Sequence, residues 1–210
     1  MTKAEIRSLV KNLLPKEDNT GKYHSGVIDA AIETVMNQIF YDVFARTPLD
    51  LDNYTRELGG AGTPIAVSLN SNTGVYYSTI PYNYVPLPDK ASGIRRVYQI
   101  ADGAVAFYPM SRREVDHARG GSYFSQASDK IGYIVRGSTI EYYKMDSTTA
   151  SAGVRMDILM SFRSYLDTDK VLFPLGREND VIKGALEMMG VIPPKDLSDD
   201  NNDIIPRNNG

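Results

Sequence analysis

The two histidines, His24 and His117, are the side chains of this sequence best suited to proton transfer near neutral pH. A histidine that acts as a general base needs a reaction partner held within hydrogen-bond distance. Asp116 directly precedes His117, but adjacent side chains of a helix point in different directions. His24 lies in a polar segment ahead of a long apolar pattern. Neither histidine therefore predicts a catalytic centre.

Motifs for other kinds of active site are absent from the sequence. There is no HExxH zinc motif, EF-hand loop, GxGxxG fingerprint, Walker A lysine or GxSxG elbow. The glycine-rich run at 59–62 is not part of a βαβ pattern, so it does not predict a phosphate site. Asp199, Asp200 and Asp203 offer oxygen ligands to a divalent cation, but an acidic, turn-rich run is more typical of a solvated tail. We therefore expect no enzyme activity, no cofactor and no metal.

Two arginine pairs, Arg112–Arg113 and Arg95–Arg96, are the best candidates for contacts with nucleic-acid phosphates. Glu114 and Asp116 dilute the positive charge of the first pair. The formal net charge of −3 also argues against a protein whose main task is to bind nucleic acid. We expect Arg112 and Arg113 to lie on an exposed face or in a salt-bridged contact between subunits.

Tyrosine is frequent, with 14 residues, most of them between positions 76 and 143, and tryptophan is absent. A tyrosine buries its ring and keeps a polar tip, which suits both strands and interfaces. The tyrosines are either ordinary strand residues or contacts with other chains. Tyr142 and Tyr143 are the interface candidates, and under that hypothesis Tyr142→Ala weakens assembly while sparing the fold.

Apolar periodicity predicts helices at both ends of the chain. Residues 2–14 begin with a Thr-x-x-Glu capping box, and residues 25–45 repeat apolar side chains at spacings of three and four. Residues 178–189 show the same period, and 51–58 predict a short helix. The long helix is expected to bury an apolar face made of Ile28, Ile32, Val35, Ile39 and Val43.

Short β-strands separated by turn residues are predicted between these helices. Three hairpins are expected, with turns at 70–73, 101–103 and 136–138, and a short helix is expected after Ser111. Alternating residues over 154–165 predict a long antiparallel strand with Ser161 facing outward. The fold class is α+β, with an N-terminal helical hairpin-like region, an antiparallel β-rich middle, a C-terminal helix and an extended tail. The expected domains are 1–58 (helical), 59–176 (β-rich), 177–192 (C-terminal helix) and 193–210 (a flexible or docking tail).

The tail is polar and acidic, yet it contains the apolar pair Ile204–Ile205. We expect these two residues to anchor the tail on a neighbouring chain, with a loose tail as the alternative. The absence of cysteine, of a signal-peptide pattern and of an apolar run of about 20 residues indicates a soluble protein made in a reducing cytoplasm.

An ordered series of short motifs resembles a known family. Tyr-Val-Pro-Leu-Pro at 84–88 precedes Gly-Ile-Arg-Arg-Val at 93–97, and Phe-Tyr-Pro-Met-Ser-Arg-Arg-Glu follows at 107–114. Tyr-Ile-Val at 133–135 and Thr-Ile-Glu-Tyr-Tyr at 139–143 complete the order. Together with the long helix before it, this series resembles the head–tail connector, or adaptor, proteins of short-tailed bacteriophages, most closely the ring proteins of crAss-like phages.

The resemblance implies a virion structural protein rather than an enzyme. Such a subunit forms a ring, expected to be a dodecamer, beneath the portal protein, extends the DNA channel and docks the next tail ring or tail component. The genome DNA would pass through the lumen without specific binding, and no membrane would be involved. The location would be the portal vertex of the virion, after synthesis in the cytoplasm of the host bacterium.

Two other classes of function stay open from the sequence. A small bacterial α+β binding module or accessory protein predicts a monomer with a ligand pocket. A hydrolase acting on cell wall or glycans predicts two carboxylates at a fixed separation in a cleft, and the sequence gives no such pair.

Overall fold

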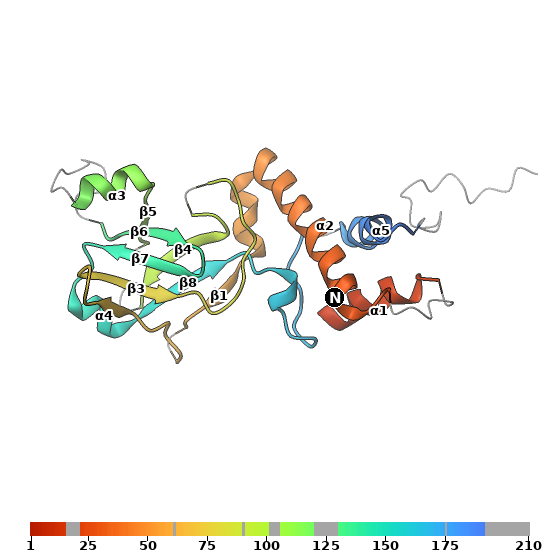
Figure 1. Cartoon of the computed structure of the whole chain (residues 1–210), viewed down its shortest axis with the longest axis horizontal. Coiled ribbons are helices and arrows are strands. Elements are labelled where there is room, and N and C mark those ends of the chain that lie inside the picture. Colours follow the sequence, from red (N-terminus) through yellow and green to blue (C-terminus); the bar gives the residue numbers. More distant parts are fainter. Residues whose placement is uncertain are drawn as a thin grey trace, which may run out of the picture. The chain divides into compact units, whose positions relative to one another are not determined.

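The computed structural model describes residues 1–15, 22–60, 62–89, 91–100, 106–119, 130–174 and 176–191. These residues form helices, one antiparallel sheet and one mixed sheet, which confirms the predicted α+β class (Figure 1). Two compact units are present: a helical unit, Met1–Ile39 with the chain from Tyr165 onward, and a β-rich unit, Phe40–Ser164. The domains expected from the sequence group residues by the type of secondary structure, whereas these two units group residues that contact one another.

The helical unit contains three predicted helices, α1 (Lys3–Asn12), the first part of α2 (Ser25–Arg46) and α5 (Glu178–Met188). The predicted capping box of α1 is confirmed, because Thr2 and Glu5 each accept a hydrogen bond from the backbone N–H of the other. Ile28, Ile32 and Ile39 of α2 are buried, as expected.

Gly184 of α5 lies close to Val35 of α2. A Cβ atom at this position would lie 2.9 Å from a methyl carbon of Val35, so a larger residue would push the helices apart. Val35 is nevertheless only partly buried, and so is Val43, although both were expected in the buried face.

The β-rich unit is built on two sheets. The first is antiparallel, with the order β1–β8–β4, and the second has the order β2–β3–β7–β6–β5, in which only the β5–β6 pair is parallel. The strands are β1 (Arg56–Leu58), β2 (Ser68–Asn70), β3 (Val75–Thr79), β4 (Ile94–Gln99), β5 (Tyr108–Pro109), β6 (Gly132–Arg136), β7 (Thr139–Tyr143) and β8 (Val154–Ile158).

Short helices complete this unit. They are the 3-10 helices η1 (Pro48–Tyr54) and η2 (Phe162–Ser164) and the α-helices α3 (Arg112–Arg119) and α4 (Ser147–Ala152). The helix predicted after Ser111 is confirmed as α3. Helix α4 was not predicted, and its N-cap Asp146 accepts a hydrogen bond of 2.8 Å from the backbone N–H of Thr149.

Phe107 joins the two sheets of the β-rich unit. Its backbone N–H donates to the Val97 carbonyl of β4, and its ring meets the ring of Tyr142 in β7 edge-on, with 5.9 Å between centroids. Val97 and Tyr142 are themselves buried. The core of this unit therefore lies between the sheets.

The helix predicted at 51–58 is wrong in its second half. The chain forms η1 and then turns into β1, where Arg56 pairs with Ile158 and Leu58 with Met156. Pairing with a strand almost a hundred residues away buries Leu58 and overrides the local helical pattern.

The second predicted hairpin is confirmed only near its turn, because its two arms then separate. β4 pairs with β8, and β5 pairs with β6 in parallel, so the two arms belong to different sheets. An antiparallel bridge between Tyr98 and Ala106 and the hydrogen bond from the Phe107 N–H to the Val97 carbonyl still join the two arms, and the expected turn lies outside the described residues. The first and third hairpins, β2–β3 and β6–β7, are confirmed.

The long strand predicted over 154–165 stops at Ile158. Leu159 and Met160 are both buried, which breaks the alternation of a strand, and Ser161 is buried rather than outward-facing. Isolated contacts continue the pairing instead, since Tyr84 bridges to Met160 and the Ser161 N–H donates to the Asn83 carbonyl.

Candidate functional site

Gly93, the first residue of the Gly-Ile-Arg-Arg-Val motif, lies where two backbone segments touch. The Gly93 carbonyl accepts a hydrogen bond from the Leu159 N–H, and the Leu159 carbonyl accepts one from the Val85 N–H, both at 2.8 Å. A Cβ atom on residue 93 would lie 2.2 Å from the Val85 carbonyl oxygen. Only glycine fits between these segments without a backbone shift.

We expect Gly93→Ala to lower the free energy of unfolding by about 1–3 kcal/mol, since the added methyl group must displace backbone rather than a flexible side chain. Chemical denaturation of the purified variant checks this value. Gly62→Ala is the matched control, because nothing lies within 4 Å of the corresponding Cβ position. Equal midpoints for the two variants would contradict the close approach.

The arginines of this motif are bound within the chain. Arg95 lies 3.1 Å from Asp52 and 3.1 Å from Asp89, and Arg96 lies 2.7 Å from the second carboxylate oxygen of Asp52. Burial raises the pKa of Asp89, and the charge of Arg95 opposes that rise. Arg95 and Arg96 therefore tie η1 to β4 rather than forming a free phosphate-binding pair.

Helix α3 is fixed to the five-stranded sheet by its cap and by one apolar side chain. The Ser111 N–H donates to Glu114 at 2.5 Å, and the Glu114 N–H donates to the Ser111 hydroxyl at 3.4 Å. Val115 is fully buried in a cluster with Met110 and Tyr143, against which Val75 and Ile134 pack. The helix is thus held on the face of the sheet that carries Tyr143.

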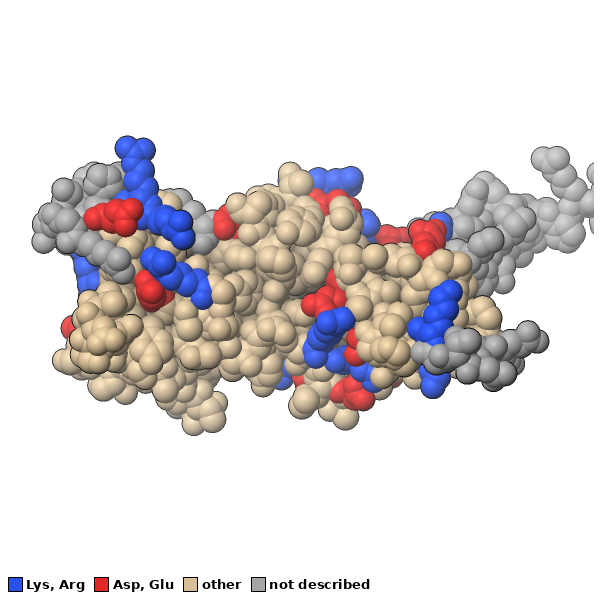
Figure 2. Space-filling view, viewed as in Figure 1, with Lys and Arg blue, Asp and Glu red and all other residues tan. Residues whose placement is uncertain are grey.

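Arg112 and Arg113, two of the predicted interface residues, are exposed in the first turn of α3. Neither has an ion-pair partner within the part of the chain that the structure describes. Figure 2 shows basic side chains gathered over α3 with acidic side chains beside them. The position of this pair suits a contact with another molecule.

Tyr142 and Tyr143 are buried in the chain itself, with 2% and 7% of their surfaces exposed. The Tyr142 hydroxyl lies 2.7 Å from the Ser78 hydroxyl, and the Tyr143 hydroxyl donates to Glu141 at 2.8 Å. The idea that Tyr142→Ala spares the fold conflicts with this burial. These two tyrosines are core residues of the β-rich unit.

Alkaline pH is expected to destabilise this core. Burial raises the pKa of Tyr133 and of Tyr142, because an ionised phenol would lose its hydration. A group whose pKa is higher in the folded state stabilises the fold below its unfolded pKa of about 10 and loses that contribution as the pH rises further. The urea midpoint should therefore fall above about pH 10, and it should fall less steeply in Tyr142→Phe. Equal pH slopes for the two proteins would contradict this assignment.

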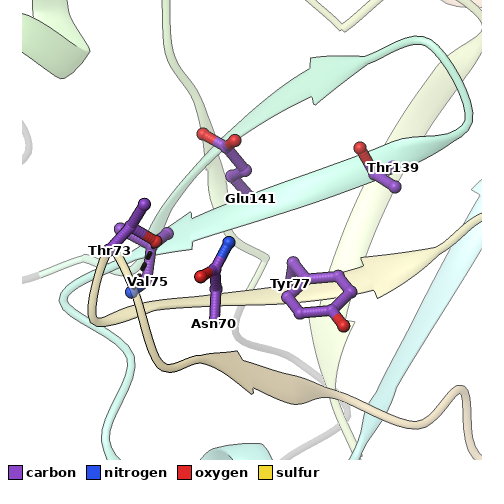
Figure 3. A pocket seen from close by; sticks show the side chains of 6 residues that line it. All are labelled: Asn70, Thr73, Val75, Tyr77, Thr139 and Glu141. Atoms are coloured by element: carbon purple, nitrogen blue, oxygen red, sulfur yellow. Dashed lines mark hydrogen bonds between the residues drawn. The ribbon is translucent and has the colours of Figure 1, made fainter.

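A shallow polar depression lies on the outer face of the second sheet, where β2, β3 and β7 meet. Its volume is about 220 Å³, below the roughly 300–1,000 Å³ of drug-sized ligand pockets. Figure 3 shows that its lining side chains come from all three strands and from the turn after β2. The lining consists of Asn70, Thr73, Val75, Tyr77, Thr139 and Glu141.

Glu141 supplies the negative charge of this depression but is already partnered. Its carboxylate lies 3.0 Å from the Arg136 guanidinium and accepts the hydrogen bond from Tyr143. The depression can hold one polar side chain or a small polar group. Sequence reasoning missed it, because Asn70 and Glu141 are far apart in sequence and only the sheet order brings them together.

The remaining predicted candidates are the two histidines and residues of the tail. His24 is exposed just before α2, and His117 belongs to α3. Ile204, Ile205 and the three tail aspartates lie outside the described residues. Among the described residues, no group of three His, Asp or Glu side chains is arranged to hold a metal ion. No helix in the described ranges is both long and apolar enough to cross a membrane.

The chain matches no protein-family profile, and no curated protein matches it.

Proposed function

We propose that this protein is a structural subunit of a bacteriophage virion that forms a head–tail connector ring. The ring, a dodecamer in this proposal, sits beneath the portal protein at the portal vertex and docks the next tail ring or tail component. The genome DNA passes through its lumen without specific binding. The protein is not an enzyme and uses no cofactor.

The observation that carries the proposal is the order of motifs that resembles the connector proteins. In the structure these motifs coincide with junctions of the β-rich unit: the contact at Gly93, the cap of α3 at Ser111 and the buried Tyr133 and Tyr142. Residues at such junctions specify a fold, so the resemblance concerns the architecture of this unit. The connector function is proposed by analogy and rests on that resemblance.

The charge distribution is compatible with a channel through which DNA must slide. The net charge is −3, and the Arg95–Arg96 pair is engaged by Asp52 and Asp89. Strong binding to phosphates requires several free basic groups, and the engagement of this pair by carboxylates favours passage of DNA over its capture.

Co-expression with a portal protein from the same phage tests the proposal. We expect a closed ring of this chain on one end of the portal, visible by negative-stain electron microscopy, and a matching mass by native mass spectrometry. A chain that stays monomeric at all concentrations and leaves the portal bare would refute the connector role.

A second candidate, a small bacterial binding module, is favoured by the polar depression at Tyr77 and Glu141. It predicts a monomer that binds a small polar ligand. Ligand titrations with Tyr77→Ala as the control separate it from the ring subunit.

A further inference from the structure

The arginine pair Arg112–Arg113 has no evident role within the described fold. Positive side chains in the first turn of a helix face the positive end of its dipole, which costs stability. The cap is already made by Ser111 and Glu114, and Val115 already anchors the helix. The pair is exposed on a fixed helix, so its position is set before any partner arrives.

The chemistry of this pair suits a carboxylate partner. A guanidinium group binds a carboxylate through two parallel hydrogen bonds, and two adjacent arginines suit a run of acidic residues. The sequence holds one such run after α5: residues 196–203 contain Asp196, Asp199, Asp200 and Asp203 and no basic residue. Residues 192–203 span up to about 40 Å when extended, enough to reach a neighbouring molecule.

We infer that Arg112 and Arg113 of one copy bind the acidic segment 196–203 of a second copy. Each subunit then offers two different patches, and their repeated pairing is a heterologous contact of the kind that builds rings. The inference rests on the ring function proposed above and gives that ring a specific contact. Many copies in one ring raise the local concentration of segments, so a weak pairing suffices.

Nucleic acid is a poorer partner for the same surface. Asp116 is exposed one helical turn from Arg112, and the whole chain is negatively charged. The negative charge of the protein repels a long polyanion such as DNA along its full length, whereas it repels a segment of eight residues only near the binding surface.

The test uses two full-length variants of opposite charge. The patch variant is Arg112→Glu with Arg113→Glu, and the tail variant is Asp199→Lys, Asp200→Lys and Asp203→Lys. Sedimentation velocity over a range of concentrations should show that each variant alone self-associates at least about tenfold more weakly than the wild type, because attraction becomes repulsion. An equimolar mixture should recover the wild-type association, since each altered patch then meets a complementary segment.

Lys11→Glu with Lys130→Glu is the control for overall charge, because both lysines are exposed and lie outside α3. It should leave association within about twofold of the wild type. Equal weakening by the control, or a mixture that does not recover, overturns the inference. If the arginines instead bind the acidic segment of their own chain, mixing the variants recovers nothing. The variants then differ from the wild type in compactness and not in association.

Two further outcomes separate this inference from the proposed function. Rings that form equally well with the patch variant overturn the arginine contact and leave the ring intact. Recovery on mixing without any ring on the portal supports the contact and refutes the connector role. Binding of a short DNA duplex that is lost in the patch variant, with no recovery on mixing, assigns the arginines to nucleic acid and overturns the inference.

Discussion

Replacing Tyr142 with alanine is expected to lower the free energy of unfolding of the β-rich unit by about 3–5 kcal/mol, the cost of truncating a large buried aromatic side chain. The side chain is 2% exposed, packs edge-on against Phe107 and bonds to the hydroxyl of Ser78. The truncation leaves a cavity between the sheets and removes one partner of a buried hydroxyl. Urea unfolding at neutral pH measures the loss.

Two variants show which part of Tyr142 matters. Tyr142→Phe keeps the ring and should cost only about 1 kcal/mol, the net value of one hydrogen bond. Tyr82→Ala changes a tyrosine that is 40% exposed and should stay within about 0.5 kcal/mol of the wild type. A Tyr142→Ala protein as stable as Tyr82→Ala would contradict the core position and restore Tyr142 as an interface candidate.

Local signals in the sequence predicted the elements whose determinants lie within a few residues of one another. The Thr2–Glu5 capping box, the apolar period of α2 and the turn at Gly137 each specify structure over one or two turns of chain. The α+β class follows from such signals, because helices and hairpins can be identified separately. No knowledge of their packing is needed.

Strand partners could not be predicted in the same way. β1 and β4 both pair with β8, although residues 56 and 94 are distant from 158 in sequence, and β5 joins β6 rather than β4. Only the folded topology selects among partners with similar alternating patterns. The loss of alternation after Ile158 has the same cause, since Leu159 is hydrogen-bonded to Val85 and Gly93, and Ser161 to Asn83.

The same distinction between local signals and long-range pairing applies to the candidate surfaces. The exposure of Arg112 and Arg113 could be predicted, because charged residues at the start of a short helix are rarely buried. The burial of Tyr142 could not, since a period of two does not say which face of a strand points inward. The depression at Tyr77 and Glu141 depends on the pairing of β3 with β7, which is a property of the sheet and not of either segment.

The ion cluster of the helical unit was also missed, and it supports a second large effect. Arg7 lies 2.8 Å from each carboxylate oxygen of Asp29, and Lys3 lies 3.7 Å from the same group. Lys3 is only 6% exposed, and it also donates to the Tyr165 carbonyl at 2.9 Å. Hydrogen bonds from Arg7 to Asp29 are the main cause of the raised pKa of Arg7. One carboxylate thus neutralises two cations that join α1 to α2.

Asp29→Ala should therefore destabilise the helical unit by about 3–5 kcal/mol, because it leaves a buried lysine and a partly buried arginine without their shared counter-charge. Hydrogen exchange of the α1 and α2 amides, together with urea unfolding, measures this loss and locates it in the helical unit. Asp167→Ala is the matched control: this carboxylate also contacts Arg7, at 3.1 Å, but its side chain is 61% exposed. That loss should not exceed about 1 kcal/mol.

A triple variant separates the net contribution of the ion cluster to the free energy of unfolding from the cost of leaving its cations without a partner. Lys3→Met, Arg7→Met and Asp29→Leu together remove the three charges that α1 and α2 contribute, leaving only the exposed Asp167 carboxylate, and such apolar replacements are often neutral or stabilising. We expect the triple variant to be more stable than Asp29→Ala, although it carries two more substitutions. If it is instead less stable, the cluster contributes net attraction beyond mutual neutralisation, and the loss in Asp29→Ala measures that attraction rather than stranded charge.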